Sequence, residues 1–221
     1  MARRESIEQR KKRVRRLLRR LRRLYPEADC ALTHRSAWQL LVATILSAQS
    51  TDETVNRVTP ILFARYPKPA DLAAADVDDV QEIIHATGFF RQKTKSIMGA
   101  ARMVVDDYRG KVPDEMADLL KLPGVARKTA NVVLGTWFQK NEGIVVDTHV
   151  GRLADRLRLV WNHKNPKDAV KIETDLMRIT ARKDWTYLSH ALIWHGRRVC
   201  MARKPDCAHC TLADECPSAD L

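Results

Sequence analysis

The sequence lacks the features that mark several classes of protein. None of its apolar stretches approaches the roughly 20 residues that a membrane-spanning helix requires. Cysteine is scarce and odd in number, and four of the five crowd between Cys200 and Cys216 instead of spreading along the chain as a disulfide framework does. Strand-like sequence is confined to Ile144–Val146, which is too short to found a sheet. These absences exclude a membrane-spanning chain and argue against a disulfide-rich secreted domain and a β-rich fold.

Helical spacing of apolar residues runs through most of the chain after Pro26. Hydrophobic residues make up 45% of the 221 residues, which is enough to bury a core, and the length suits one large domain or two small ones. A capping box at Ser50–Glu53 predicts the start of a helix that runs through Tyr66. We therefore predict an all-α protein, with further helices near residues 36–47, 69–74, 77–86, 91–108, 114–120, 126–139, 148–160, 166–180 and 184–197.

The positive charge of the chain is concentrated at its N-terminus. Lys and Arg number 39 against 27 Asp and Glu, a net charge of +12, and residues 1–25 contribute +10 of it through twelve Lys or Arg and two Glu. Such an excess indicates a polyanionic partner, most often nucleic acid. The same segment carries an apolar stripe at helical spacing, and we expect a basic amphipathic helix. Three roles are open to it: packing with solvated Arg side chains, contact with phosphates, or targeting to a membrane or an organelle.

A tight turn is expected between two helices within residues 114–139. Pro123 stops the first helix, and Gly124 permits a left-handed backbone conformation. The turn is expected to direct the backbone N–H groups from Gly124 to Ala126 outward at the positive end of the second helix, where a phosphate oxygen can bind. An ordinary corner between two helices is the alternative.

Lys128 lies in the first turn of the second helix, beside the expected phosphate site. At about 100° per residue it lies about 180° from the middle of the buried stripe, which is expected to comprise Ala126, Ala130, Val133, Leu134 and Trp137. A Lys in this position is either a solvated charge or an amine placed for nucleophilic attack.

Asp147 follows the apolar run Ile144–Val146 and begins a predicted helix. Asp is a favoured N-cap residue, so capping alone explains it. A capping carboxylate is also held rigidly and favoured in its ionised form by the positive helix end, which is compatible with a chemical role. Lys128 and Asp147 lie nineteen residues apart on different helices, and only the tertiary fold can bring them together.

The clustered cysteines have the spacing of a metal centre, Cys200-x6-Cys207-x2-Cys210-x5-Cys216. Four thiolates suit tetrahedral zinc or an iron–sulfur cluster. Zinc ribbons usually use two C-x2-C pairs, and only one occurs here, so the unequal loops favour a larger iron–sulfur cubane. His209, inside the short pair, is a weaker ligand candidate.

Together these motifs resemble the endonuclease III family of helix–hairpin–helix DNA glycosylases. The resemblance rests on Leu122-Pro-Gly-Val-Ala-Arg-Lys-Thr-Ala130, Val146-Asp-Thr-His149, Leu46-Ser-Ala-Gln-Ser-Thr-Asp52 and the four-Cys spacing. These features occur in the family's order from about residue 30 to 216, so nearly the whole chain is covered.

The resemblance implies two helical lobes. Residues 31–142 would form a six-helix, barrel-like domain with the helix–hairpin–helix at 114–139. Residues 1–30 and 143–221 would form a second helical domain, closed by a [4Fe–4S] cluster loop at residues 200–216.

The resemblance also implies a bifunctional DNA glycosylase and AP lyase of base excision repair that excises oxidised pyrimidines from duplex DNA. Lys128 would attack the sugar C1′ of a flipped nucleotide, expel the base and form a Schiff base, after which β-elimination cuts the strand 3′ to the lesion. Asp147 would assist proton transfer or stabilise an oxocarbenium-like state. The expected partner is double-stranded DNA containing oxidised pyrimidines or abasic sites. We further expect a monomer with no membrane partner, located in the cytoplasm with the nucleoid.

Other residues are implied to contact DNA. Gln49 resembles the residue that fills the gap left by the extruded base. The Gly88-Phe-Phe-Arg91 turn resembles a loop that wedges the opposite strand, with Phe90 or Arg91 at its tip. A helix-capping Gln and a buried Phe explain these residues as well. The predicted DNA contacts are Gln49, Phe90, Arg91, Gly124, Val125, Ala126, Arg127, Arg203 and Lys204.

Two positions fall outside the family pattern. The family's hairpin usually has a second Gly where this chain has Ala126, and the added methyl group is expected to restrict the approach of the backbone to phosphate. Cys30 matches no ligand position, so we expect a small buried apolar residue there.

Two other functions remain open at this point. A monofunctional mismatch-adenine glycosylase of the same superfamily shares the cluster and the Asp, but such enzymes lack a Lys at the position of Lys128 and carry an added C-terminal domain. A non-catalytic iron–sulfur DNA-binding module would use Lys128 only as a phosphate contact. Replacement of Lys128 by Ala distinguishes them, because the enzyme loses its covalent step and the module loses only modest affinity.

Overall fold

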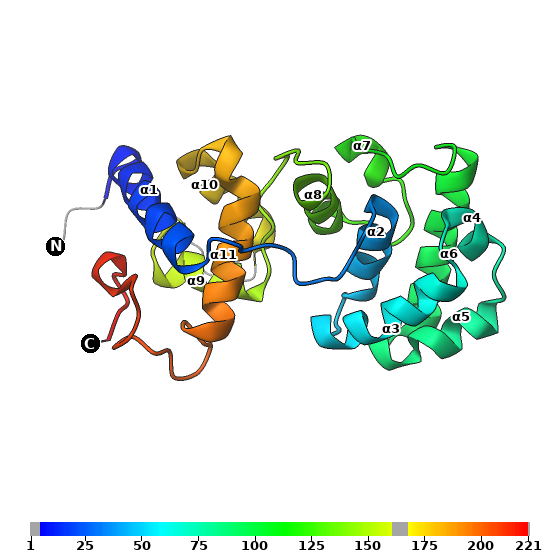
Figure 1. Ribbon diagram of the computed structural model, residues 1–221. Helices are drawn as coiled ribbons and strands as arrows, with labels where there is room; N and C mark the ends of the chain where they lie inside the picture. The colour runs from blue at the N-terminus through cyan, green and yellow to red at the C-terminus, as the bar shows by residue number, and fades with distance from the viewer. Residues whose placement is uncertain (1–4, 161–167, 221) are drawn as a thin grey trace. The chain divides into compact units, whose positions relative to one another are not determined.

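The computed structural model describes residues 5–160 and 168–220, and within these ranges its regular structure is entirely helical (Figure 1). The all-α prediction is confirmed. The strand-like run Ile144–Val146 forms no strand; it is buried, and the N–H of Val145 donates to Ser189 Oγ at 2.9 Å. None of the described helices has the length and apolar character needed to cross a membrane. The chain forms two compact units, Cys30–Glu142 and the pair of segments Met1–Asp29 and Gly143–Leu221. We refer to them as the hairpin unit and the cysteine-loop unit.

The hairpin unit is built around α2. Eight of the ten residues of α2 are buried and none is charged, the composition expected of a helix surrounded by others. It packs against α3, α6 and α8. Seven α-helices form this unit, compared with the six that the family resemblance implies, and α4 and α7 are no longer than five residues: α2 (Ala37–Leu46), α3 (Asp52–Arg65), α4 (Pro69–Ala73), α5 (Val77–Ile84), α6 (Phe90–Asp106), α7 (Met116–Leu119) and α8 (Arg127–Thr136).

The described part of the cysteine-loop unit contains four α-helices around a separate core: α1 (Ile7–Leu24), α9 (Thr148–Arg156), α10 (Ala169–Ile179) and α11 (Trp185–Arg198). The apolar stripe of α1 lies in this core, with Val14, Leu17, Leu18 and Leu21 each no more than 5% exposed. Because these four residues are buried against their own unit, they are not available for insertion into a membrane; only Ile7 and Leu24, near the two ends of α1, leave apolar side chains of the helix exposed, at 41% and 37%.

Polar side chains begin most of the longer helices by accepting hydrogen bonds from the first free backbone N–H groups. Thr51 caps α3, where the sequence predicted a capping box at Ser50–Glu53; that prediction is wrong by one residue because Thr51, the next hydroxyl residue along the chain, accepts from the N–H of Thr54. The capping residues in the described chain are Ser6, Ser36, Thr51, Asp76, Asp147 and Asp168.

Two further predictions differ from the structure. The helix expected near 114–120 is a single turn, Met116–Leu119. Of the stripe predicted for α8, Ala130, Val133 and Leu134 are buried, but Ala126 is exposed and Trp137 is 40% exposed. Both lie at the ends of α8, where fewer neighbouring side chains cover the helix.

Candidate active site and cysteine loop

Gly124 shapes the hairpin turn for two independent reasons. Its φ is +78°, in the left-handed region that side chains rarely adopt. A Cβ atom at this position would lie 2.7 Å from Cβ of Ser96 and 3.2 Å from Cγ2 of Ile45, so a side chain would also collide with α6 and α2. The turn therefore packs closer to α2 and α6 than it could with any residue other than glycine at position 124.

The start of α8 is not capped by any side chain. The N-cap residue is Ala126, and the first turn of the helix contains no acidic residue. The backbone N–H groups of Gly124, Ala126 and Lys128 have no hydrogen-bond acceptor within the described residues, whereas the N–H of Val125 donates to the Leu122 carbonyl at 3.1 Å and is not directed outward as predicted. Unsatisfied N–H groups at the positive end of a helix form an anion site, so this end of the hairpin suits a phosphate.

Lys128 is exposed in the first turn of α8, beside these N–H groups, and no ion pair or hydrogen bond within the described residues occupies its amine. Arg127, which precedes it, is also exposed, and its guanidinium lies 3.5 Å from the Glu142 carbonyl oxygen. Ala126 has φ −99° and ψ 171°, a conformation open to any residue, so the Ala in place of the family's Gly costs the backbone nothing here.

Asp147 caps α9 in the cysteine-loop unit. Its Oδ1 accepts hydrogen bonds from the N–H groups of His149 and Val150, both at 2.8 Å. Its second oxygen has no hydrogen-bond partner among the described residues. Capping therefore uses one oxygen and fixes the carboxylate, and it leaves the other oxygen available to a substrate.

The four clustered cysteines line one pocket in the cysteine-loop unit, together with apolar residues that include Leu153, Val199 and Leu212. No three His, Cys, Asp or Glu side chains of the described residues are arranged to hold a single metal ion. A cubane fits this set better than zinc, because each of its four irons takes one thiolate, whereas zinc draws all four sulfurs to one point. His209 is exposed and contacts Asp206 at 2.8 Å, which removes it from the ligand set.

Helix α9 holds the first cysteine of the loop. Arg152 donates to the carbonyl oxygens of Gly196 and Cys200, at 2.8 and 3.0 Å. Arg156 donates to the Cys200 sulfur at 3.2 Å and to the Met201 carbonyl at 2.7 Å. An N–H donor to sulfur stabilises a thiolate, and both arginines lie on the helix that Asp147 begins.

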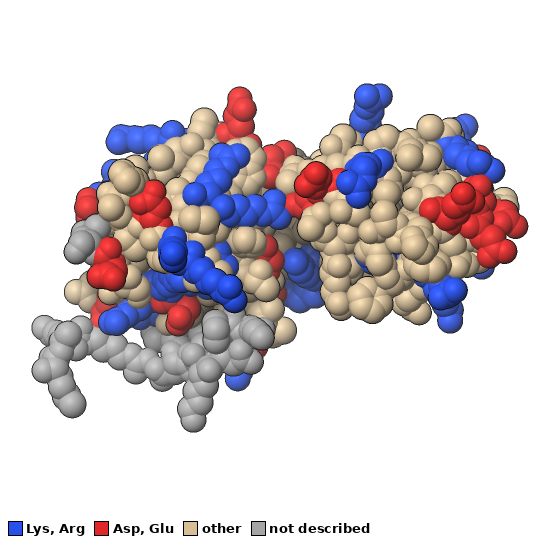
Figure 2. Space-filling model, turned by 90° about the horizontal axis from the view of Figure 1, so that it is seen from below, with Lys and Arg blue, Asp and Glu red and all other residues tan. Residues whose placement is uncertain are grey.

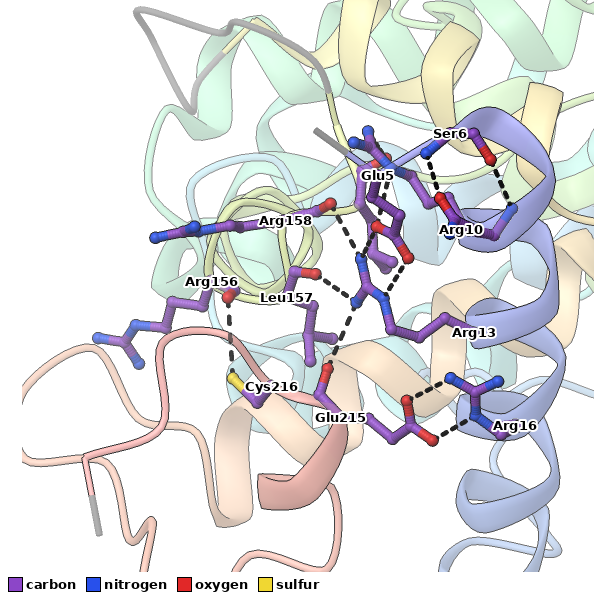
Figure 3. Close-up of polar contacts among 12 residues, drawn as sticks. Glu5, Ser6, Arg10, Arg13, Arg16, Arg156, Leu157, Arg158, Glu215 and Cys216 are labelled. Atoms are coloured by element: carbon purple, nitrogen blue, oxygen red, sulfur yellow. Dashed lines mark hydrogen bonds and ion pairs between the residues drawn. The ribbon is translucent and has the colours of Figure 1, made fainter. Parts of the chain in front are cut away.

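Helix α1 holds the other end of the loop (Figure 3). The guanidinium of Arg13 donates to the carbonyl oxygens of Leu157, at 2.7 Å, and of Glu215, at 3.4 Å. Arg16 forms a two-pronged ion pair with the Glu215 carboxylate, with Nη2 2.9 Å from Oε2. Arg20 donates to the Thr211 carbonyl at 2.8 Å. The part of the loop that precedes Cys216 is thus fastened to one face of α1.

His195 of α11 lies beneath Cys210. Burial lowers the pKa of His195 to about 4, so its ring is neutral at physiological pH. Its Nδ1 lies 3.0 Å from the Tyr25 hydroxyl and its Nε2 lies 3.5 Å from the Cys210 sulfur.

Cys30 is half-buried and makes a further interaction, so the expectation of a buried apolar residue at this position is wrong.

The residue at the tip of the predicted wedge turn is Phe89, where the sequence analysis placed Phe90 or Arg91. Phe89 is 67% exposed and has φ +48°, directly after Gly88 at φ +69°. Phe90 begins α6 and is half-buried, with its ring 4.5 Å from that of His85 and the guanidinium of Arg91 4.9 Å above it. The left-handed conformation at both Gly88 and Phe89 moves the exposed ring one residue earlier than expected.

A buried amine contacts the backbone directly before the Gly88–Phe89 turn. Nζ of Lys93 donates to the Thr87 carbonyl at 2.7 Å, and burial lowers the pKa of Lys93 below its ordinary value.

The remaining predicted DNA contacts are all exposed. Gln49 has φ +52°, and its side chain has no partner among the described residues, so it does not cap a helix. Arg203 and Lys204 lie in the longest segment between loop cysteines, again without a described partner.

Comparison with known proteins places the chain in a family. Residues 42–181 match the HhH-GPD superfamily of base excision DNA repair proteins. Endonuclease III of Synechocystis sp. is 52% identical over 214 residues, covering 97% of this chain and 96% of that protein. A non-covalent endonuclease III–DNA complex superposes with a TM-score of 0.87 at 38% identity, over 95% of this chain and 96% of the other. A trapped covalent endonuclease III–DNA intermediate superposes with a TM-score of 0.86 at 37% identity, over the same shares.

The helical fold and the uncapped hairpin helix with its Lys define a base excision DNA repair protein of the helix–hairpin–helix class. More narrowly, the chain belongs to the endonuclease III family, the DNA glycosylases that are also AP lyases, and DNA is its partner.

Four arginines and one aromatic residue with clear structural roles were not found from the sequence: Arg13, Arg16, Arg152, Arg156 and Phe89. Apart from Glu5, which pairs with Arg13, and His149, which lies beside Arg152, the partners of these arginines lie between 44 and 202 residues away along the chain, so local spacing could not reveal them.

Proposed function

We propose that this protein removes oxidised pyrimidines from duplex DNA and cuts the strand at the resulting site, with Lys128 as the nucleophile. The observation that supports it best is the exposed Lys128 beside three backbone N–H groups that have no acceptor among the described residues, at an uncapped helix start. In this arrangement the N–H groups hold a backbone phosphate, and the amine lies within one helical turn of it.

The reaction proceeds on a nucleotide that has been turned out of the duplex, because C1′ cannot be reached within the stack. The Lys128 amine forms a bond to C1′ as the bond from C1′ to the base breaks, and the base leaves with a proton. Ring opening gives a Schiff base. Loss of a proton from C2′ then breaks the bond between C3′ and its oxygen, and the strand is cut 3′ to the lesion.

Asp147 acts on the first of these steps. Its free oxygen stabilises positive charge that develops at C1′ or relays the proton that the base takes away. The two hydrogen bonds to Oδ1 hold the carboxylate in one orientation while it does so.

The test uses duplexes that carry either one oxidised pyrimidine or one abasic site. Lys128→Ala is expected to abolish strand cutting on both. Lys121→Ala is the matched control, because Lys121 is an exposed Lys of the same hairpin that pairs with Asp118; it is expected to retain both activities. Asp147→Asn is expected to slow base release more than cutting at the abasic site. Strand cutting by Lys128→Ala at the wild-type rate would refute the nucleophile assignment.

We propose in addition that Cys200, Cys207, Cys210 and Cys216 hold a [4Fe–4S] cluster. When bound, the cluster supplies four iron–thiolate bonds that cross-link a loop otherwise without regular structure apart from one 3-10 turn. Each Cys→Ser variant should lose the visible absorbance of the cluster and its iron and sulfide content. Cys30→Ser, outside the loop, should keep both. Full iron content in two or more of the loop variants would contradict the assignment.

We propose three sets of DNA contacts: the hairpin backbone and Arg127 on the damaged strand, Gln49 and the Phe89 turn at the extruded nucleotide, and Arg203 with Lys204 on backbone phosphates. We also propose that the protein acts as a monomer in the cytoplasm, where its DNA substrate lies.

A further inference from the structure

The ten basic residues of α1 do not form a uniform charged surface, because the helix places them on different faces. Arg13, Arg16 and Arg20 point toward the cysteine loop and are paired there. Arg22 pairs with Asp184, and Lys11 pairs with Glu8. On the side seen in Figure 2, Lys and Arg side chains of this unit are interspersed with Asp and Glu. The charges that remain unpaired are therefore few and can be identified one by one.

Four exposed cations of α1 have no hydrogen bond or ion pair with any described residue: Lys12, Arg15, Arg19 and Arg23. Their spacing of three, four and four residues places them within about 80° of one another around the helix at about 100° per residue. This sector lies opposite the buried stripe. We call these four residues the basic ridge. At about 1.5 Å per residue they extend along about 16 Å of the helix.

One carboxylate accompanies the ridge. Glu8 lies at its N-terminal end, where its carboxylate interacts electrostatically with Lys12 and Arg15. However, its Oε1 already accepts a hydrogen bond from Lys11 at 2.9 Å. The ridge beyond Arg15 has no acidic residue on the same helix, because Glu5 and Glu8 are the only acidic residues of the first 26.

A groove adjoins the ridge on the α10 side. It has a volume of about 310 Å³ and is lined by Lys11, Arg15, Arg178, Thr180 and Asp184, among others. Asp184 is taken up by Arg22, so the groove retains a net positive charge. Thr180 is 6% exposed, and its hydroxyl has no hydrogen-bond partner in the described part of the chain.

We propose that the basic ridge and this groove bind the phosphate backbone of duplex DNA, as a contact surface additional to the hairpin and the cysteine loop. Duplex DNA carries about one negative charge per 1.7 Å of its axis, so a 16 Å row of four cations faces about nine phosphates, which is enough for each cation to contact one. The contact carries no sequence information and raises affinity for undamaged DNA along which the enzyme searches. An anionic membrane is the less suitable occupant, since the apolar face that would insert is buried in the core.

The test measures binding to an undamaged duplex over a range of salt concentrations, so it does not depend on Lys128 or on any lesion. The ridge variant replaces Lys12, Arg15, Arg19 and Arg23 with Gln. The charge-matched control replaces Lys68, Lys95, Arg109 and Lys111, four exposed cations of the hairpin unit. Each phosphate contact contributes about 0.9 to the slope of log K against log salt concentration. The ridge variant should therefore reduce the magnitude of the slope by up to about 3.6, and the control should reduce it by less than 1.

Several outcomes would overturn the proposal. The first is a wild-type slope in the ridge variant. The second is an equal reduction of the slope in the control variant, which would attribute the effect to net charge alone. The third is a ridge variant that no longer binds phosphatidylserine vesicles but still binds DNA as the wild type does. Arg178→Gln alone should reduce the slope by about 0.9, and an unchanged slope would remove the groove from the proposed surface. Because all four ridge side chains are exposed and unpaired, the unfolding midpoint should stay at the wild-type value, so a folding defect is distinguishable from lost contacts.

Discussion

The substitution Arg13→Met is expected to be the most destabilising change of any charged residue in α1. The Arg13 guanidinium is buried, pairs with Glu5 at 2.7 Å and donates to the carbonyl oxygens of Leu157, Arg158 and Glu215. Leu157 and Arg158 follow the last residue of α9, so Arg13 satisfies carbonyl groups that the end of that helix leaves free. It therefore connects three segments of the unit: α1, the end of α9 and the cysteine loop.

The magnitude follows from what Met leaves behind. Met preserves most of the volume but donates nothing, so the buried Leu157 carbonyl and the partly buried Glu5 lose a charged partner. Hydrogen bonds to charged groups contribute about 1.5–3 kcal/mol each, and breaking a buried pair by removing one partner costs about 3–5 kcal/mol. Glu5 can regain some water, so we expect a loss of about 3 kcal/mol. Arg15→Met, on the exposed ridge of the same helix, should change stability by no more than about 0.5 kcal/mol.

The assay is urea unfolding of the cluster-loaded protein, followed by helical circular dichroism and by the visible absorbance of the cluster. Arg13→Met should lower the midpoint of both transitions relative to Arg15→Met. If the two variants unfold within about 0.5 kcal/mol of each other, the reasoning about Arg13 is wrong.

Three further predictions concern the hairpin unit. Gly124→Ala should lower the free energy of unfolding by at least about 1–2 kcal/mol because of the left-handed backbone alone, and by more because of the collision with Ser96 and Ile45. Thermal unfolding measures the loss. Gly110→Ala is the control for backbone strain, because Gly110 has φ +76° but open space around it. Burial lowers the pKa of Lys93, so between that pKa and the ordinary value for Lys the unfolded chain holds a proton that the folded chain lacks. The free energy of unfolding should therefore rise with pH across this alkaline range, and Lys93→Met should flatten the rise. An identical pH profile in the variant would exclude the buried amine as its source. Phe89→Ala should weaken binding to damaged duplex without lowering the unfolding temperature, while Phe90→Ala should lower that temperature; the reverse pattern would return the tip of the wedge to Phe90.

Features determined by neighbouring residues were predictable from the sequence. The helical spacing placed every long helix of the described chain, and the Pro123–Gly124 pair located the hairpin turn. Asp147 was recognised as an N-cap because Asp before an apolar helical pattern satisfies the free N–H groups at the helix start.

Features determined by distant residues were not predictable. The pattern of α1 shows which side chains are buried, but whether an Arg is paired depends on Glu215, Asp214 or Asp184 more than 150 residues later. Adjacent residues of one type are a second source of error. Ser50 and Thr51 both suit a cap, and Phe89 and Phe90 both suit the tip of a turn, so only the backbone conformation decides between them.

We expect Lys128 to form the covalent bond to DNA. The most direct measurement is borohydride reduction of the wild-type protein on a duplex with one oxidised pyrimidine, followed by protease digestion and mass spectrometry of the cross-linked peptide. A single modified residue, Lys128, is expected, with no trapped product from Lys128→Ala. A cross-link at any other Lys or at the N-terminal amine, or no cross-link from cluster-loaded wild type that still releases the base, would contradict it.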